Sequence, residues 1–181
     1  MVPDRRRRYD WPVASYVLDE GGENDNRSIP LATKQGNWIR NVRKPEHLPG
    51  RLGSAAKALC GAFPNIRLRS LSATYNCVGM VFAARRTWVE PEEIDLIRRD
   101  DEYIRVERPV VGDLVVYRRS ADGGICHIGQ VVEIERDVQT AHHRATVLSQ
   151  WGQDGEYLHD IADVPELYGS QREFWTERRN P

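Results

Sequence analysis

The chain has 181 residues, a length that suits one domain or one domain with an arm. Charged residues make up 29% of the chain and nearly cancel, giving a formal net charge of -1. This balance argues against a nucleic-acid binder, which is normally basic. The three cysteines are not arranged in CxxC pairs, and their odd number argues against a disulfide framework.

No long apolar run follows the basic residues near the N-terminus. The sequence therefore predicts no secretory signal peptide of the usual kind and no membrane span. The expected location is the cytoplasm, or the destination of a secretion system that delivers proteins without a cleaved signal peptide. The sequence has no glycine-rich phosphate loop, and His142 and His143 lack further metal ligands nearby. We expect no cofactor and no metal.

Residues 1–50 are predicted to form an irregular arm or wrapping segment. Prolines and aromatic residues are scattered here without a helical or strand period, and residues 21–26 predict a flexible turn. The run from Arg5 to Arg8 could contact phosphate or an acidic protein partner, although a solvated arm is the simpler interpretation. The folded domain is expected at residues 51–181.

Three stretches predict helices. Residues 53–62 are rich in alanine after Ser54, which can cap a helix. Residues 90–99 carry acids at the start and arginines at the end, which complements a helix dipole. The third helix follows Asn76, a good N-cap, and its apolar residues recur at helical spacing as far as Val89.

The pattern changes to the period of strands after residue 102. Alternating or continuous apolar runs predict strands at residues 103–107, 113–117, 125–134, 145–150 and 172–178, with a short helical turn at 163–169. Helices first and hairpin-connected strands afterwards predict an α+β domain with a mainly antiparallel sheet.

Cys77 and His127 stand out as candidates for chemistry. Cys77 occupies the first position of its predicted helix, where free N–H groups and the dipole stabilise a thiolate. The alternative is a cysteine that only fills the core. His127 lies early in a strong strand, and Gly129 leaves room beside the imidazole. A cysteine on a helix and a histidine on a sheet are the parts of a nucleophilic pair.

Three motifs around these residues resemble the NlpC/P60-like cysteine hydrolase superfamily, which has a papain-like fold. Asn-Cys-Val-Gly-Met-Val (76–81) is similar to that family's Asp-Cys-Ser-Gly-Leu-Val box. Gly-Asp-Leu-Val-Val-Tyr (112–117) resembles its Gly-Asp-Leu-Val-Phe-Phe strand, and His-Ile-Gly-Gln-Val-Val (127–132) its His-Val-Gly-Ile-Tyr strand. The order is typical of the family. The resemblance covers residues 74–150 and suggests a divergent member.

The resemblance implies a fold with N-terminal helices packed on a mainly antiparallel sheet, Cys77 as nucleophile and His127 as base. In the family, a residue on the following strand orients the imidazole. Gln150 and Ser149 are the candidates here, and Gln150 is preferred because an amide oxygen can accept from the ring N–H. These two neighbours face opposite sides of a strand, and His159 is a further candidate.

The chain departs from the family pattern at Asn76, which replaces the usual Asp, and at Val78, which replaces the usual Ser. The segment after residue 148 resembles a tail of some bacterial NlpC/P60-like and amidase-like domains. It is expected to be a structural cap, although Trp151 could instead line a substrate groove. Asn76, Trp151 and His159 are the expected contacts on the substrate side.

The implied function is a cysteine peptidase or amidase that cleaves an amide bond of a peptide or peptidoglycan-like substrate. The backbone N–H of Cys77 would help to hold the oxyanion. Two alternatives stay open. The chain could be a catalytically inactive binding module with a papain-like fold, or a toxin-like acyl transferase or deamidase that acts on a protein.

Overall fold

The computed structural model describes residues 28–136 and 143–179. Residues 1–27, which include the arginine run, and His142 lie outside the described residues. The structure therefore does not test the expectations about the arginine run or about a metal site at His142 and His143.

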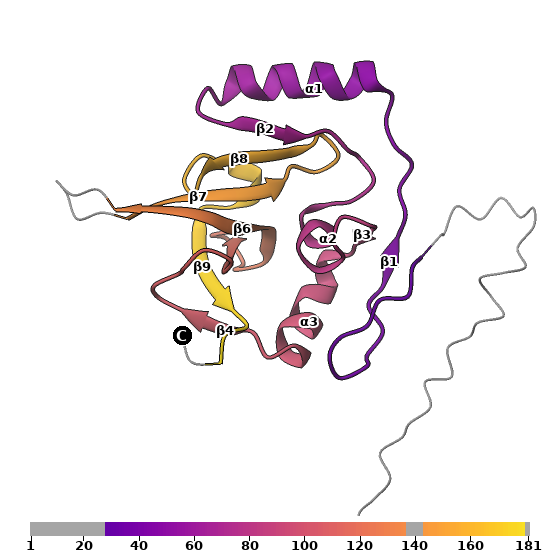
Figure 1. Cartoon of the computed structure of the whole chain (residues 1–181), viewed down its shortest axis with the longest axis vertical. Coiled ribbons are helices and arrows are strands. Elements are labelled where there is room, and N and C mark those ends of the chain that lie inside the picture. Colours follow the sequence, from indigo (N-terminus) through magenta and orange to yellow (C-terminus); the bar gives the residue numbers. More distant parts are fainter. Residues whose placement is uncertain (1–27, 137–142, 180–181) are drawn as a thin grey trace, which may run out of the picture.

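An antiparallel sheet of seven strands forms the centre of the domain (Figure 1). The strand order is β2-β8-β7-β6-β5-β9-β4, and each neighbouring pair is antiparallel. A small second sheet pairs β1 (Asn41–Val42) with β3 (Trp88–Val89). The strands of the large sheet are β2 (Arg67–Ser70), β4 (Ile104–Val106), β5 (Leu114–Arg118), β6 (Ile125–Arg136), β7 (His143–Gln150), β8 (Glu156–Asp160) and β9 (Gln171–Thr176).

Helices accompany this sheet, which confirms the predicted α+β class. Helix α1 (Pro49–Ala62) contacts β2, and α2 (Cys77–Phe82) contacts β6 and β7. A 3-10 turn, η2 (Pro91–Glu93), leads directly into α3 (Ile94–Asp100), and a second turn, η3 (Glu166–Tyr168), precedes β9. Within residues 28–136 and 143–179, no helix is long and apolar enough to cross a membrane.

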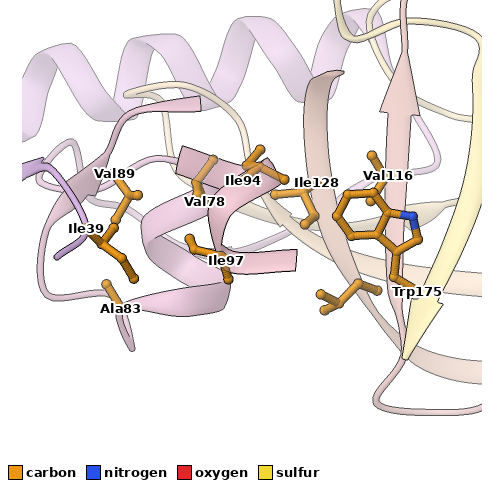
Figure 2. Packing of buried hydrophobic residues seen from close by; sticks show 10 residues of the cluster. Ile39, Val78, Ala83, Val89, Ile94, Ile97, Val116, Ile128 and Trp175 are labelled. Carbon is orange, nitrogen blue, oxygen red and sulfur yellow. The ribbon is translucent and has the colours of Figure 1, made fainter. Parts of the chain in front are cut away.

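Helices α2 and α3 cover one face of the sheet (Figure 2). The core on this face joins Val78 of α2 and Ile94 and Ile97 of α3 to strand residues Ile128 and Trp175. All five side chains are at most 2% exposed. Burying an aliphatic side chain of this size contributes roughly 1.5–3 kcal/mol, so this layer is a main source of stability.

The other face of the sheet is buried as well. Val115, Tyr117 and Val147 form a second cluster with partly buried Val164 and Phe174. Neighbours such as Val115 and Val116 point to opposite faces, since side chains alternate along a strand. Because both faces of the sheet are buried, the residues of β5 are apolar without alternation.

Helix α1 starts earlier than predicted. The alanine-rich body suggested a start near Ser54, but the helix begins at Pro49. Proline suits the first helical position because its missing N–H would have no partner there. The predicted helix at residues 90–99 is present as η2 followed by α3.

Helix α2 is much shorter than predicted. The apolar spacing extended to Val89, but the helix ends at Phe82, and Trp88–Val89 form strand β3. Ala84 and Arg85 adopt positive φ angles of 49° and 65°, which turns the chain back across the helix. A Cβ at Gly79 would lie 1.9 Å from the carbonyl oxygen of Thr87, so the returning chain requires glycine there.

The predicted N-cap of α2 is confirmed. Asn76 is 4% exposed, and its Oδ1 accepts hydrogen bonds from the backbone N–H of Gly79 at 2.9 Å and of Val89 at 3.2 Å. Its Nδ2 donates to the carbonyl oxygen of Val89 at 2.7 Å. One side chain therefore starts the helix and also holds β3 against it.

The described part of the N-terminal segment lies along α3. Ile39 is 2% exposed and packs into the core beside α2 and α3. Thr33 Oγ1 donates to Asp100 Oδ2 at 2.9 Å, and the backbone N–H of Lys34 donates to Asp101 at 2.6 Å. Residues from 31 onwards thus contribute to the folded core, ahead of the boundary expected at residue 51.

Replacing Asn76 with Ala is expected to lower the free energy of unfolding by about 2–4 kcal/mol, because the helix cap is lost and the groups of Val89 lose buried partners. Urea denaturation monitored by circular dichroism measures this change. Asn65→Ala is the matched control, since Asn65 is exposed and makes only a 3.4 Å contact with Asp163. Equal effects of the two substitutions would contradict the role given to Asn76.

Candidate functional site

Cys77 begins α2 and packs against the core formed by α2, α3 and the sheet. The residue is partly exposed, yet burial of its thiol raises the pKa to about 11. The backbone N–H groups of Ile128, Val78 and Cys77 itself act in the opposite direction. The prediction that the helix start lowers the thiol pKa is therefore wrong for this structure, because burial outweighs the N–H groups of a helix of six residues.

His127 is 1% exposed and lies between two tyrosine rings. Its ring is stacked on Tyr168, with centroids 4.1 Å apart and planes at 13°, and is tilted against Tyr117 at 5.5 Å. Neither ring nitrogen has a hydrogen-bond partner among the described residues. Burial, together with a smaller contribution from the charge of His159, lowers the pKa of His127 to about 3. The ring is therefore neutral at pH 7.

No hydrogen bond joins Cys77 and His127, although the thiol lies beside the backbone of the residue that follows His127 in β6. The backbone N–H that acts on the thiol belongs to Ile128, the residue directly after His127. The pairing of β6 with β7 begins only at Gln130, so residues 127 and 128 lie beyond that ladder. Burial raises the pKa of Tyr168, and the charge of Cys77 adds to the rise. Thiol, imidazole and phenol therefore share one neighbourhood.

Gln150 and Ser149 do not orient His127 in this structure. Gln150 is fully buried, and its Nε2 donates to the carbonyl oxygens of Ser72 at 2.8 Å and Gly152 at 3.1 Å. Its Oε1 has no partner within the described chain. Ser149 Oγ lies 2.8 Å from His159 Nε2. Neither residue forms a hydrogen bond with the His127 ring, so the prediction that one of them orients it is wrong for this structure.

The three residues expected on the substrate side are all buried. The side chain of Asn76 caps α2 and bonds to Val89. His159 is 1% exposed, and its Nδ1 lies 2.8 Å from the carbonyl oxygen of Asp160. Trp151 is also 1% exposed, and its Nε1 donates to Ser149 Oγ at 3.0 Å. Its ring packs at 5.3 Å against Phe63 of α1. Trp151 therefore acts as a structural cap here, and the expected groove contacts are absent.

The space expected beside His127 at Gly129 is occupied by the neighbouring strand. A Cβ at Gly129 would lie 2.5 Å from Cγ1 of Val147 and 3.1 Å from Cβ of Ser149. Glycine is required here by the close approach of β7. The space that the sequence predicts beside His127 is therefore filled by β7 and has no room for a substrate.

Sequence reasoning missed the role of Tyr168. The segment around it was predicted as a turn of helix, and η3 confirms that local structure. The contact with His127 joins residues far apart in the chain, and no local pattern reports such a contact. Proline and glycine around the turn, at Pro165 and Gly169, were the only signal that this segment has a defined shape.

Sequence reasoning also missed the buried carboxylate that holds the chain after α2. Glu156 is 2% exposed and accepts a hydrogen bond from Tyr75 Oη at 2.9 Å. Arg85 pairs with the same carboxylate through Nε and, at 3.3 Å, through Nη2. These bonds tie the residues on both sides of α2 to strand β8. The strand itself was not predicted.

Two further features concern ligands. Among residues 28–136 and 143–179, no group of three or more His, Cys, Asp or Glu residues could hold a metal ion. A hollow of about 440 Å³ lies beside η3. Its walls include Arg119, Val164, Glu166, Gly169 and Arg172.

Comparisons of the chain with models of protein families, with curated proteins and with solved structures found no match.

Protonation of His127 is expected to destabilise the fold as the pH falls. Its pKa is about 3 in the folded protein and near the ordinary 6.5 after unfolding, so the unfolded chain binds more protons between these values. Between pH 7 and pH 5 this group should cost the wild type about 2 kcal/mol of unfolding free energy, relative to His127→Phe.

Urea denaturation of both proteins at pH 7 and pH 5 measures this difference. His159, whose pKa is also lowered by burial, remains in both proteins, so its contribution cancels. The same pH dependence in the two proteins would show that the His127 ring is solvated in solution.

Proposed function

We propose that the protein is a cysteine hydrolase that cleaves an amide bond, with Cys77 as nucleophile and His127 as general base. One observation carries this proposal. Only four buried side-chain nitrogen or oxygen atoms of the described residues lack a partner, and three of them are Nδ1 and Nε2 of His127 and Oε1 of Gln150. Unpaired buried polar atoms are rare in folded proteins, and a catalytic role is one of the explanations for them.

The position of these atoms relative to the thiol supports the proposal. His127 directly precedes the residue whose N–H acts on the Cys77 thiol. Gln150 bonds to Ser72, in the segment that leads into α2. The three motifs of the sequence that resemble NlpC/P60-like hydrolases contain Cys77 and His127, and they suggest an amide of the peptide or peptidoglycan type.

The protonation states define how the reaction would start. At pH 7 the thiol and the imidazole are both neutral, so the proton must move from Sγ to His127 as sulfur attacks the carbonyl carbon. The carbonyl electron pair moves to oxygen, and the backbone N–H of Cys77 helps to stabilise that oxyanion. When the C–N bond breaks, the imidazolium returns the proton to the leaving nitrogen.

A thioester on Cys77 remains after the amine has left. Water then attacks this carbonyl and gives a proton to His127, and the thiolate takes up that proton as the carboxylic acid departs. An acyl transfer to another nucleophile would use the same residues. Deamidation would follow the same steps with ammonia as the leaving group.

The second candidate function is a non-catalytic binding module. It is favoured by the missing hydrogen bond between Cys77 and His127 and by a thiol pKa of about 11. Catalytic cysteines are commonly held as thiolates by a nearby imidazolium, which this conformation lacks.

Hydrolysis assays separate the two candidates. With a panel of peptides and muropeptides, Cys77→Ala should abolish cleavage, and His127→Ala should lower kcat by about 100-fold or more. Cys126→Ala is the matched control, because this partly buried cysteine directly precedes His127 and has no role in the proposed reaction. If the wild type cleaves none of the panel but binds one member as tightly as Cys77→Ala does, the binding module becomes the better description.

The reactivity of the free thiol tests the neutral pair directly. Alkylation of Cys77 by iodoacetamide, followed by mass spectrometry of the labelled peptide, should rise about tenfold for each pH unit from pH 7 towards pH 10, since the thiol pKa is about 11. A rate that is already constant below pH 7 would reveal a thiolate–imidazolium pair in solution.

A further inference from the structure

The ring of Tyr168 covers His127. The two rings are nearly parallel, with planes at 13° and centroids 4.1 Å apart, and His127 is 1% exposed as a result of its neighbours on both sides. A buried imidazole without any partner has no route by which to gain or lose a proton. A base in this position must therefore be uncovered before it can work.

The segment that carries Tyr168 is held weakly. Its backbone bonds are local: Tyr168 N donates to Pro165 O and Gly169 N to Glu166 O, both at 2.9 Å. Within the part of the chain that the structure describes, no side chain of residues 164–169 makes a hydrogen bond or ion pair. Apolar packing of Val164 and Tyr168, including an edge contact with Trp151 at 6.0 Å, holds the segment in place.

The surroundings leave room for this segment to move. Leu167 is 71% exposed, although leucine is normally buried. The hollow of about 440 Å³ borders the same segment at Val164, Glu166 and Gly169. Gly169, with a φ of 88°, is the fixed end of the segment: it is buried, and a Cβ there would lie 2.3 Å from the carbonyl oxygen of Arg118.

We propose that residues 164–169 form a gate over the candidate site, and that Tyr168 is the side chain that closes it. This inference rests on the proposed function, because the gate controls the residue assigned as the base. In the closed state Tyr168 shields His127 from water and substrate. In the open state the imidazole is accessible to the thiol proton and to the substrate carbonyl.

Opening the gate changes the surroundings of His127 on one side only. The Tyr117 ring of β5 still lies against the imidazole, His159 of β8 still acts on its pKa, and the thiol of Cys77 still lies beside the N–H of Ile128. Water replaces Tyr168, so the loss of burial raises the pKa of His127 towards its ordinary value. This change is measurable without any substrate.

The decisive variants are Tyr168→Ala, which removes the ring, and Tyr168→Phe, which keeps it. The hydroxyl of Tyr168 has no hydrogen-bond partner among the described residues, so the phenylalanine variant should stay closed. Leu167→Ala is the matched control for a truncation in the same turn, because Leu167 is largely exposed. The readouts are the NMR titration of the His127 ring and the alkylation rate of Cys77 at pH 7.

In Tyr168→Ala the titration midpoint of His127 should rise by at least about one pH unit, and alkylation of Cys77 should accelerate about tenfold. Tyr168→Phe and Leu167→Ala should match the wild type in both readouts. An unchanged midpoint and rate in folded Tyr168→Ala would overturn the gate, as would equal effects of the alanine and phenylalanine variants at position 168.

Hydrogen exchange of the wild type tests the gate even if Tyr168→Ala does not fold. The amides of Tyr168 and Gly169 should exchange at least about 100-fold faster than the ladder amides of β9, because local opening exposes them. Protection equal to that of β9 would refute the gate.

The outcomes also separate the gate from the enzyme. If the gate behaves as expected but no amide substrate is cleaved, the gate stands and the hydrolase proposal fails. If the wild type cleaves a substrate through Cys77 and the Tyr168 variants change neither readout, the hydrolase proposal stands and the gate fails.

Discussion

The side chain of Asn76 makes the connection on which the site depends. Helix α2 has six residues, too few to be stable alone, so its position comes from its cap and its packing. The hydrogen bonds of Asn76 to Gly79 and Val89 define where the helix starts and where the returning chain lies. The thiol of Cys77 is therefore placed by an amide side chain that takes no part in the proposed reaction.

Some of the polar side chains buried in the sheet have hydrogen-bond partners, and others retain atoms without a partner. The hydrogen bond between Ser149 and His159 joins β7 to β8, and the pair of Glu156 with Arg85 joins β8 to the chain after α2, so these buried groups stabilise the packing. His127 and Gln150 are buried in the same sheet and retain unpaired atoms. Such an arrangement costs stability, and natural proteins tolerate this cost chiefly where function requires it.

Local signals in the sequence predicted the local structure well. The N-cap at Asn76, the strands β4 to β7 and β9 and the turn η3 depend on capping, alternation and glycine or proline, all visible in short windows. The predicted length of α2 is wrong because Trp88 and Val89 fit the spacing of a helix but belong to strand β3. The stacking of Tyr168 on His127 depends on tertiary contacts, to which no local pattern responds.

The edge strands of the large sheet affect how copies of this protein associate. Among the described strands, β2 and β4 form the two edges, and unpaired edges can recruit strands of other molecules. Exposed Arg67 and Arg69 lie on β2, and β4 is only three residues long and carries exposed Arg105. Two such edges brought together would oppose guanidinium groups. Repulsion between them works against the growth of one sheet into another and favours separate molecules in a crowded solution.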